Sequence, residues 1–173
     1  MSRKVIYEVG ISLDGYIARP DGTFDFLKPD PEHDFNAFFK TVDVALMGRK
    51  TYEVMKTLGM NGYPRMQNYV FTHTLPAGER DGIVFTAKNP AKLVRELKLK
   101  KGKNIYLCGG SDLARELLHA RLVDEISLGI IPVLIGEGVP VFLPPYPELK
   151  LKRTVCKPYK SGMVLLTYSV KNN

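Results

Sequence analysis

Leu46–Glu53 places a glycine, two cations and a hydroxyl where an apolar strand passes into a helix. Free N–H groups and the helix dipole at such a start favour an anion. Gly48 permits close backbone approach, and Arg49 can contact a phosphate through two N–H groups. Lys50 adds a second positive charge and Thr51 a hydroxyl donor. These residues predict a phosphate site, although an ordinary strand-to-helix turn with exposed basic residues explains them equally well.

A second turn of the same kind, Gly109-Gly110-Ser111, lies between an expected strand and an expected helix. It matches neither the Gly-x-Gly-x-x-Gly dinucleotide pattern nor the Walker pattern. A tight turn with positive φ also accounts for paired glycines. Two such turns at the carboxyl ends of strands in one parallel sheet are more informative, because open α/β sheets bind ligands there. Together they predict one crevice that suits a dinucleotide with separated phosphates.

The segment Ser12–Ala18 forms a third candidate, because a strand turns tightly at Asp14-Gly15 and continues through small and apolar residues. One interpretation is a loop that closes over a flat ring. Taken alone, the segment is explained as well by a plain β-turn.

Hydrophobic periodicity and turn residues predict the elements that position these turns. Strands are expected at Lys4–Ser12, Val44–Met47, Tyr69–Thr72, Ile83–Thr86, Asn104–Cys108 and Asp124–Leu134. Helices are expected at Pro31–Val42, at Thr51–Leu58, from an Asn89-Pro90 start to Gly102, and at Asp112–His119. The first of these helices rests on an apolar face formed by Phe35, Phe38, Phe39 and Val42. Leu149–Cys156 and Met163–Val170 are expected to pair as antiparallel strands.

This alternation of strands and helices, followed by strands alone, predicts an α/β fold. We expect three layers, with a mostly parallel central sheet covered by helices on both faces and antiparallel strands added by the C-terminal segment. The sequence contains no internal repeat and no long linker, so residues 1–173 are expected to form a single domain.

The 173 residues carry a net charge of +7, but the basic residues are spread out and are not interleaved with aromatic side chains. Nucleic acid is therefore not an expected partner. Cys108 and Cys156 lie in apolar, strand-like segments and are expected to be reduced, and no metal site is expected from the three histidines. No apolar run is long enough to span a membrane, and the N-terminal residues do not resemble a signal peptide, so a cytoplasmic protein is expected.

Several segments, taken in order, resemble the dihydrofolate reductase superfamily. The resemblance is strongest to the branch that contains the C-terminal reductase domain of bacterial riboflavin-biosynthesis enzymes. It is carried by Ser12–Ala18, Met47–Glu53, Tyr69–Thr72, Ile105–Gly110, Leu117–Glu125 and Pro132–Phe142. These segments cover nearly the whole chain, and the resemblance implies the fold of that superfamily and NADPH as the hydride donor.

The resemblance also implies which residues hold the cofactor. Gly48, Arg49, Lys50 and Thr51 would contact phosphates of the adenosine half, and Thr72 and His73 would lie beside its 2′-phosphate. Gly109, Gly110, Ser111 and Leu113 would receive the pyrophosphate, and Gly10, Ile11 and Ile17 would border the nicotinamide.

For the chemical step, the resemblance places a carboxylate at the first helix, where Glu32 and Asp34 are the candidates for assisting proton transfer. Charges that favour a helix start explain these two residues equally well. The expected function is NADPH-dependent reduction of a small heterocyclic or carbonyl compound, similar to 5-amino-6-(5-phosphoribosylamino)uracil reduction or dihydrofolate reduction. A nucleotide-binding regulatory module without catalysis is the alternative.

A homodimer is the expected assembly. Residues 126–135 form a nearly continuous apolar run, which is too uniform for an exposed edge strand. Such an edge needs a cover. Helices of the same subunit could supply it, but the resemblance to riboflavin-type reductases favours a two-fold interface in this part of the fold.

Overall fold

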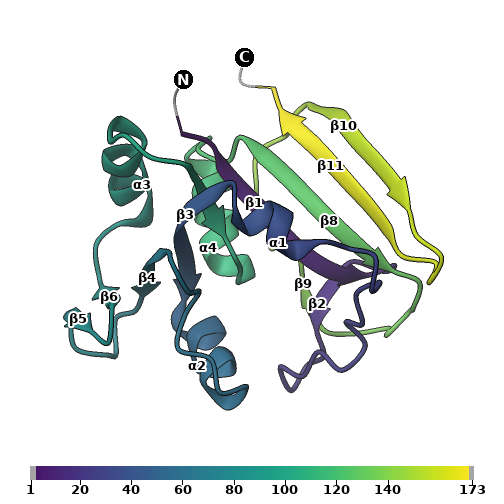
Figure 1. Ribbon diagram of the computed structural model, residues 1–173, viewed down its shortest axis with the longest axis horizontal. Coiled ribbons are helices and arrows are strands. Elements are labelled where there is room, and N and C mark those ends of the chain that lie inside the picture. The colour runs from purple at the N-terminus through teal and green to yellow at the C-terminus, as the bar shows by residue number, and fades with distance from the viewer. Residues whose placement is uncertain (1–2, 172–173) are drawn as a thin grey trace.

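The computed structural model describes residues 3–171 (Figure 1). Its strands are β1 (Val5–Ser12), β2 (Tyr16–Ala18), β3 (Val42–Gly48), β4 (Gln67–Phe71), β5 (Gly78–Arg80), β6 (Ile83–Thr86), β7 (Asn104–Leu107), β8 (Glu125–Ile131), β9 (Val139–Pro140), β10 (Leu151–Pro158) and β11 (Val164–Val170). Its helices are α1 (Phe35–Phe39), α2 (Arg49–Thr57), α3 (Pro90–Leu99) and α4 (Ser111–His119).

Within residues 3–171, nine strands form one mixed sheet in the order β10-β11-β8-β1-β7-β3-β4-β6-β5. Every neighbouring pair from β8 to β6 is parallel, whereas β10, β11 and β5 join antiparallel. The short strands β2 and β9 form a separate antiparallel pair. The predicted α/β fold, mostly parallel with antiparallel C-terminal strands, is confirmed.

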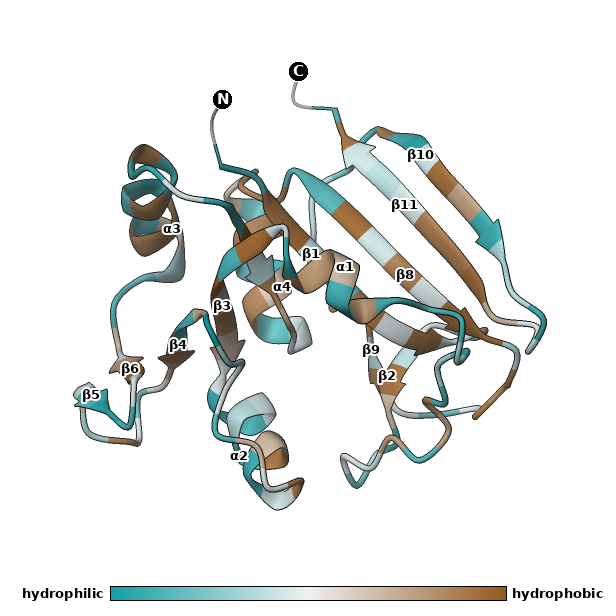
Figure 2. Ribbon diagram, in the orientation of Figure 1, coloured by the Kyte–Doolittle hydropathy of each residue, from teal (hydrophilic) through white to brown (hydrophobic). Residues whose placement is uncertain are grey.

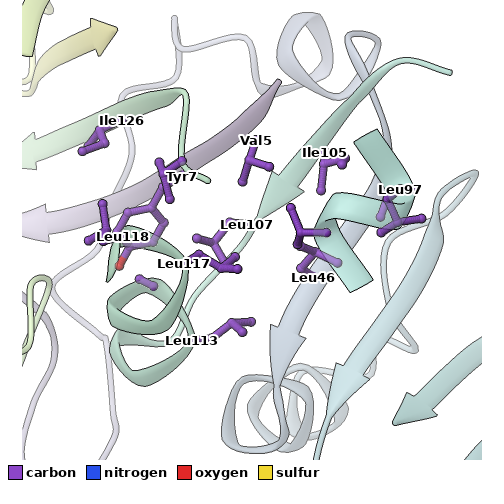
Figure 3. Close-up of a cluster of buried hydrophobic side chains, with 14 of the residues drawn as sticks. Val5, Tyr7, Leu46, Leu97, Ile105, Leu107, Leu113, Leu117, Leu118 and Ile126 are labelled. Carbon is purple, nitrogen blue, oxygen red and sulfur yellow. The ribbon is translucent and has the colours of Figure 1, made fainter. Parts of the chain in front are cut away.

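Two apolar layers lie on opposite faces of the sheet. On one face, α3 and α4 pack on alternate residues of β1, β3 and β7, and Figure 3 shows Leu117 of α4 beside Leu107 and Leu118 of α4 beside Tyr7. On the other face, Met55 of α2 and the aromatic rings of α1 pack on the intervening residues. Figure 2 shows the hydrophobic colour concentrated along β1 and β3, as expected for strands buried on both faces.

The start of α3 is fixed by two residues, Asn89 and Pro90. The Asn89 side chain accepts a hydrogen bond from the backbone N–H of Lys92, and Pro90 takes the first helical position. Both features were predicted, since Asn is a strong N-cap and Pro loses nothing where the N–H has no helical partner. The apolar face formed by Leu93, Val94 and Leu97 is buried.

The first helix is much shorter than predicted. The expected helix Pro31–Val42 is observed only as the five residues of α1, and Val42 is the first residue of β3. Asp34 caps the start of α1, and Thr41 closes its end by donating both its N–H and its hydroxyl to the carbonyl of Phe38. The β-branched residues Val42 and Val44 favour a strand, so their apolar spacing reflects the sheet and not a helix.

The predicted strand Asp124–Leu134 ends earlier, at Ile131, because Pro132 has no N–H to donate to a neighbouring strand. β8 lies between β1 and β11 and is therefore not an edge strand. The apolar run was expected to need a covering partner if β8 were an open edge. That partner is β11 of the same chain. No helix among residues 3–171 is long and apolar enough to cross a lipid bilayer.

Candidate functional site

A cleft of about 1020 Å³ runs along the carboxyl ends of the parallel strands β1, β7, β3, β4 and β6. This is the edge of an open α/β sheet at which ligands are generally bound. We call the part lined by the turns after β3, β4, β6 and β7 the phosphate end, after the ligand expected there from the sequence. The β1 end is lined by residues that include Glu8, Gly10, Ile17, Leu27, Tyr63 and Tyr106.

The turn between β3 and α2 supplies one side of the phosphate end. Gly48 is the N-cap of α2 and provides no side chain to satisfy the first N–H groups of the helix. Gly48, Arg49, Lys50 and Thr51 all line the cleft, as predicted. Arg49 Nη1 lies 2.5 Å from Oε1 of Glu53, one turn further along α2, so this guanidinium already has an intrahelical partner.

The turn between β7 and α4 supplies the facing side. Gly110 is the N-cap of α4, again with no side-chain cap, and the peptide bond between Gly109 and Gly110 is cis. A methyl group added at Gly110 would lie 3.7 Å from Thr51 Oγ1, its one neighbour within 4 Å. The two glycine turns are therefore adjacent across an open space, as expected from the sequence. Ser111 lines the same space, although its hydroxyl donates to the carbonyl of Pro140.

The ends of β4 and β6 extend the phosphate end. Thr72 and His73 line the cleft where the sequence analysis placed them. Buried Thr72 uses its hydroxyl oxygen to accept hydrogen bonds from the N–H groups of Thr74 and Leu75, which fixes the turn. Lys88, exposed after β6, adds a cation that the sequence analysis did not name. The signal for Lys88 was available, because it stands directly before the helix start at Asn89.

Of the three residues expected to border the nicotinamide, two line the cleft and one does not. Gly10 and Ile17 line the β1 end of the cleft, whereas Ile11 is buried in the core beneath it. Gly10 is closely packed, since a methyl group added there would lie 3.3 Å from Leu27 Cδ2. Leu113 lines the cleft from the first turn of α4.

The turn after β1 is held against the loop that follows β8. The Asp14 carboxylate accepts hydrogen bonds from the N–H groups of Ile135 and Gly136, and Ser12 Oγ accepts one from Tyr16. Hydrogen bonds, first from the Ser12 side chain and then from these N–H groups, lower the pKa of Asp14. The third predicted turn is therefore anchored, and it leads directly into Ile17, which lines the cleft.

Neither sequence-predicted acid lies in the cleft. Asp34 is exposed and accepts a hydrogen bond from the N–H of Ala37 as the N-cap of α1. Glu32 is also exposed, and its carboxylate lies 2.9 Å from Lys160 Nζ. The structure gives Asp34 the helix-start role that was the alternative explanation, whereas Glu32 forms a surface ion pair with Lys160.

The carboxylate that does line the cleft is Glu8, which the sequence analysis did not select. It lies on β1, on the opposite face from Tyr7 and Val9. Its side chain is 12% exposed, and Oε1 lies 3.9 Å from Nε2 of His33. Burial, assisted by the charge of Glu125, raises the pKa of Glu8 to about 7. The signal in the sequence was a carboxylate in the middle of an otherwise apolar, central strand, where an unpaired acid is rarely found.

His33 is a second residue that the sequence analysis did not select. Its Nδ1 lies 2.8 Å from the hydroxyl of Tyr159, and its ring packs edge-on against Phe35. Burial and the nearby charge of Lys157 lower its pKa, so the ring is neutral near pH 7. Residues 8, 33 and 159 are thus brought together from three separate parts of the chain. Among residues 3–171, no three His, Cys, Asp or Glu side chains gather as a metal site.

Comparison with known proteins agrees with this fold. The chain is 31% identical to the uncharacterized protein YwjB of Bacillus subtilis (strain 168) over 169 residues, which cover 95% of this chain and 97% of the relative. A putative riboflavin biosynthesis protein from Shewanella sp. PV-4 superposes with a TM-score of 0.85 at 24% identity, covering 99% of this chain and all of the other. A deaminase/5-amino-6-(5-phosphoribosylamino)uracil reductase from Thermotoga maritima gives a TM-score of 0.72 at 16% identity, with 98% and 57% of the two chains covered.

The sequence model that describes the RibD C-terminal domain matches residues 3–165, nearly the full length of the chain. Because this match covers nearly the whole chain, the protein is a member of the RibD C-terminal domain family.

Proposed function

We propose that the protein is a cytoplasmic NADPH-dependent reductase of a small heterocyclic or carbonyl compound. Its activity would be similar to that of 5-amino-6-(5-phosphoribosylamino)uracil reductase in riboflavin biosynthesis or of dihydrofolate reductase. The observation that carries this proposal is the pair of adjacent, uncapped helix starts at Gly48 and Gly110, which share one cleft at the carboxyl edge of a parallel sheet. Such starts bind phosphate groups through backbone N–H donors.

The residues present fit a dinucleotide phosphate. The space above Gly110 lacks any side chain of its own, so a pyrophosphate can approach the first N–H groups of α4. Arg49, Lys50 and Lys88 place three cations along the phosphate end, beside His73. Cations in this position suit the additional 2′-phosphate that distinguishes NADPH from NADH.

At the β1 end, the chain would position the substrate beside the nicotinamide. The cofactor, when bound, supplies a hydride, and the protein supplies orientation and exclusion of water. Gly10 lines this end of the cleft with Leu27 packed closely over it, and Ile17 closes the side of the cleft next to the anchored turn after β1.

The test is a fluorescence titration of the protein with NADPH and with NADH. We expect tighter binding of NADPH by roughly tenfold or more, because a charge-assisted contact to a phosphate contributes ~1.5–3 kcal/mol. Lys50→Gln should reduce this preference, whereas the affinity for NADH should change little. Equal affinities of the unmodified protein for the two cofactors would remove the assignment of Arg49 and Lys50.

Catalysis is tested separately from binding. NADPH oxidation is followed with a panel of pteridines, pyrimidines and quinones. Turnover of any of these compounds supports a reductase, whereas tight NADPH binding without oxidation by the whole panel would favour the regulatory nucleotide-binding module.

A further inference from the structure

Glu8 is a largely buried carboxylate with few polar partners in the protein. Within residues 3–171 its carboxylate forms no hydrogen bond, and His33 Nε2, 3.9 Å away, is beyond hydrogen-bond distance. Burying an acid without partners is unfavourable, so a side chain of this kind is expected to serve a ligand or to be held neutral. Because Glu8 also lines the cleft, a ligand is placed to supply the missing partners.

The groups that surround Glu8 are neutral, apart from one second carboxylate. Tyr63, Tyr106 and Cys108 line the same cleft, and burial raises the pKa of each of them, so all three keep their protons. On the other side, Glu125 of the neighbouring strand β8 makes the environment more negative. Glu8 therefore has no positive side chain against it, and it exchanges its proton near neutral pH.

The charges of the cleft are strongly segregated. Lys and Arg occur only at the phosphate end among the described residues that line the cleft. Lys157 is the cation close to His33, but it lies 4.5 Å from the ring centroid of Tyr159 and does not line the cleft. Recognition of a second phosphate at the β1 end would require Arg or Lys there. A substrate that carries its own phosphate has no counter-charge at this end.

The shape of the β1 end favours a planar ring. Its walls are formed by aromatic and aliphatic side chains, including Tyr63, Tyr106 and Leu27. A single polar group among apolar walls fixes the orientation of a small ligand. A carboxyl group matches a ring nitrogen next to an amino group, because the pair forms two hydrogen bonds whichever partner holds the proton.

From this arrangement we propose that Glu8 is the residue that binds the substrate, and that the substrate is a flat nitrogen heterocycle with an N–H-bearing edge and no phosphate group. This inference rests on the proposed reductase function and specifies the substrate class of that site. It assigns to Glu8, on β1, the substrate contact that the sequence analysis sought at Glu32 and Asp34. The neutral ring of His33 lies 3.9 Å from this carboxylate and contacts the Tyr159 hydroxyl on its other side.

The experiment compares two probes by calorimetric titration, with and without saturating NADPH. The first probe is 2,4-diaminopyrimidine, a flat heterocycle with the required edge, and the second is uridine 5′-monophosphate, a pyrimidine that carries a phosphate. We expect the diaminopyrimidine to bind more tightly. Glu8→Gln should weaken its binding by roughly tenfold or more, the value of a charge-assisted hydrogen bond. The affinity for NADPH should stay the same in this variant.

Glu148→Gln is the matched control, because Glu148 is exposed and outside the cleft, and it should leave both affinities unchanged. Tighter binding of uridine 5′-monophosphate, absence of diaminopyrimidine binding, or equal binding by the Glu8→Gln variant would each overturn the inference. Failure of NADPH to bind would instead contradict the proposed function, and the titrations without NADPH would still report on Glu8.

Discussion

Glu8 is largely but not fully buried in the folded protein, and its titration is therefore coupled to stability. Its pKa is about 7 in the fold, against 4.5 for an exposed glutamate, mainly because burial penalises the charged form. The folded protein holds this proton more tightly than the unfolded chain does. The stabilisation from Glu8 is therefore complete below about pH 4.5 and is lost as the pH rises through about 7.

We predict that Glu8→Gln becomes more stable relative to the unmodified protein as the pH rises. Glutamine cannot ionise, so the variant escapes a loss on the order of 3 kcal/mol between about pH 5 and about pH 8. Thermal unfolding followed by circular dichroism at both pH values measures the effect, which should amount to several degrees. Other acids titrate equally in both proteins and cancel in the difference. A difference in melting temperature between the two proteins that does not change with pH would show that Glu8 is already ionised and solvated in the fold.

The sequence predicted the glycine turns that line the cleft better than the carboxylate that lines it. Gly48 and Gly110 stand at local strand-to-helix junctions, so a short segment contains the whole signal. The pairing of Glu8 with His33 depends on how β1 meets the loop before α1, which no short segment records. Glu32 and Asp34 were chosen from their place near a helix start; the structure uses Asp34 as the N-cap of α1 and pairs Glu32 with Lys160 on the surface.

Among the elements, the turn between β7 and α4 is formed by two glycines, Gly109 and Gly110, so it presents backbone and almost no side chain to the cleft. Gly110 has φ −91°, a value that other residues adopt readily, and a methyl group there would meet only Thr51 Oγ1, at 3.7 Å. The fold therefore does not itself require glycine at this position. Gly109 differs, because its φ of +113° is a conformation that disfavours other residues.

We predict that Gly110→Val abolishes NADPH binding and leaves the protein folded. A branched side chain would occupy the space above the first N–H groups of α4, where the pyrophosphate is proposed to bind. Fluorescence titration measures the affinity, and circular dichroism measures the fold. Gly109→Val provides the contrast, because it should also reduce stability through its positive φ. NADPH affinity like that of the unmodified protein in the Gly110 variant would rule out this turn as the pyrophosphate site.

The accuracy of the predicted elements followed the amount of local information. For α3, the cap, the proline and the apolar face all agree, and the helix starts at the predicted residue. For α1, four apolar positions at helical spacing suggested three turns, but the last of them belongs to β3. Strand pairing decided that conflict, since Val42 is held beside Asn104 in the parallel pair β3–β7. Period alone could not separate the end of a helix from the start of a strand.

For the whole molecule, the C-terminal strands β10 and β11 determine which part of the sheet is exposed and could contact a second subunit. Figure 1 shows β11 and β10 extending the sheet beyond the helices. β10 is exposed along its full length and carries Lys152, Arg153 and Lys157. Charged side chains on an edge strand oppose pairing with another sheet. The expected dimer cannot form through an open edge at β8, because β8 is an internal strand. Pairing of two β10 edges is also disfavoured by these charges.

The broad face of β8 and β11 remains as the surface for the homodimer that we predict. Leu128 and Ile130 of β8 stand opposite Leu166 and Val164 of β11 on one face of the sheet, and all four are only partly buried. A contiguous apolar surface of this kind is typical of an interaction site, and a specific contact should bury at least ~1,000 Å². A two-fold interface would let the face cover itself.

Light scattering at micromolar concentration tests the assembly, with an expected mass of about twice the 19.4 kDa of the chain. Leu166→Lys places a charge in the centre of the proposed interface and should yield a folded monomer, because the side chain is partly exposed in one subunit. Lys152→Ala, on the exposed edge strand β10, is the control and should stay dimeric. A mass of 19.4 kDa for the unmodified protein would show that one subunit tolerates this face in water, and the dimer would be withdrawn. A dimer that persists in Leu166→Lys would move the interface to another surface, since a buried unpaired charge strongly opposes association.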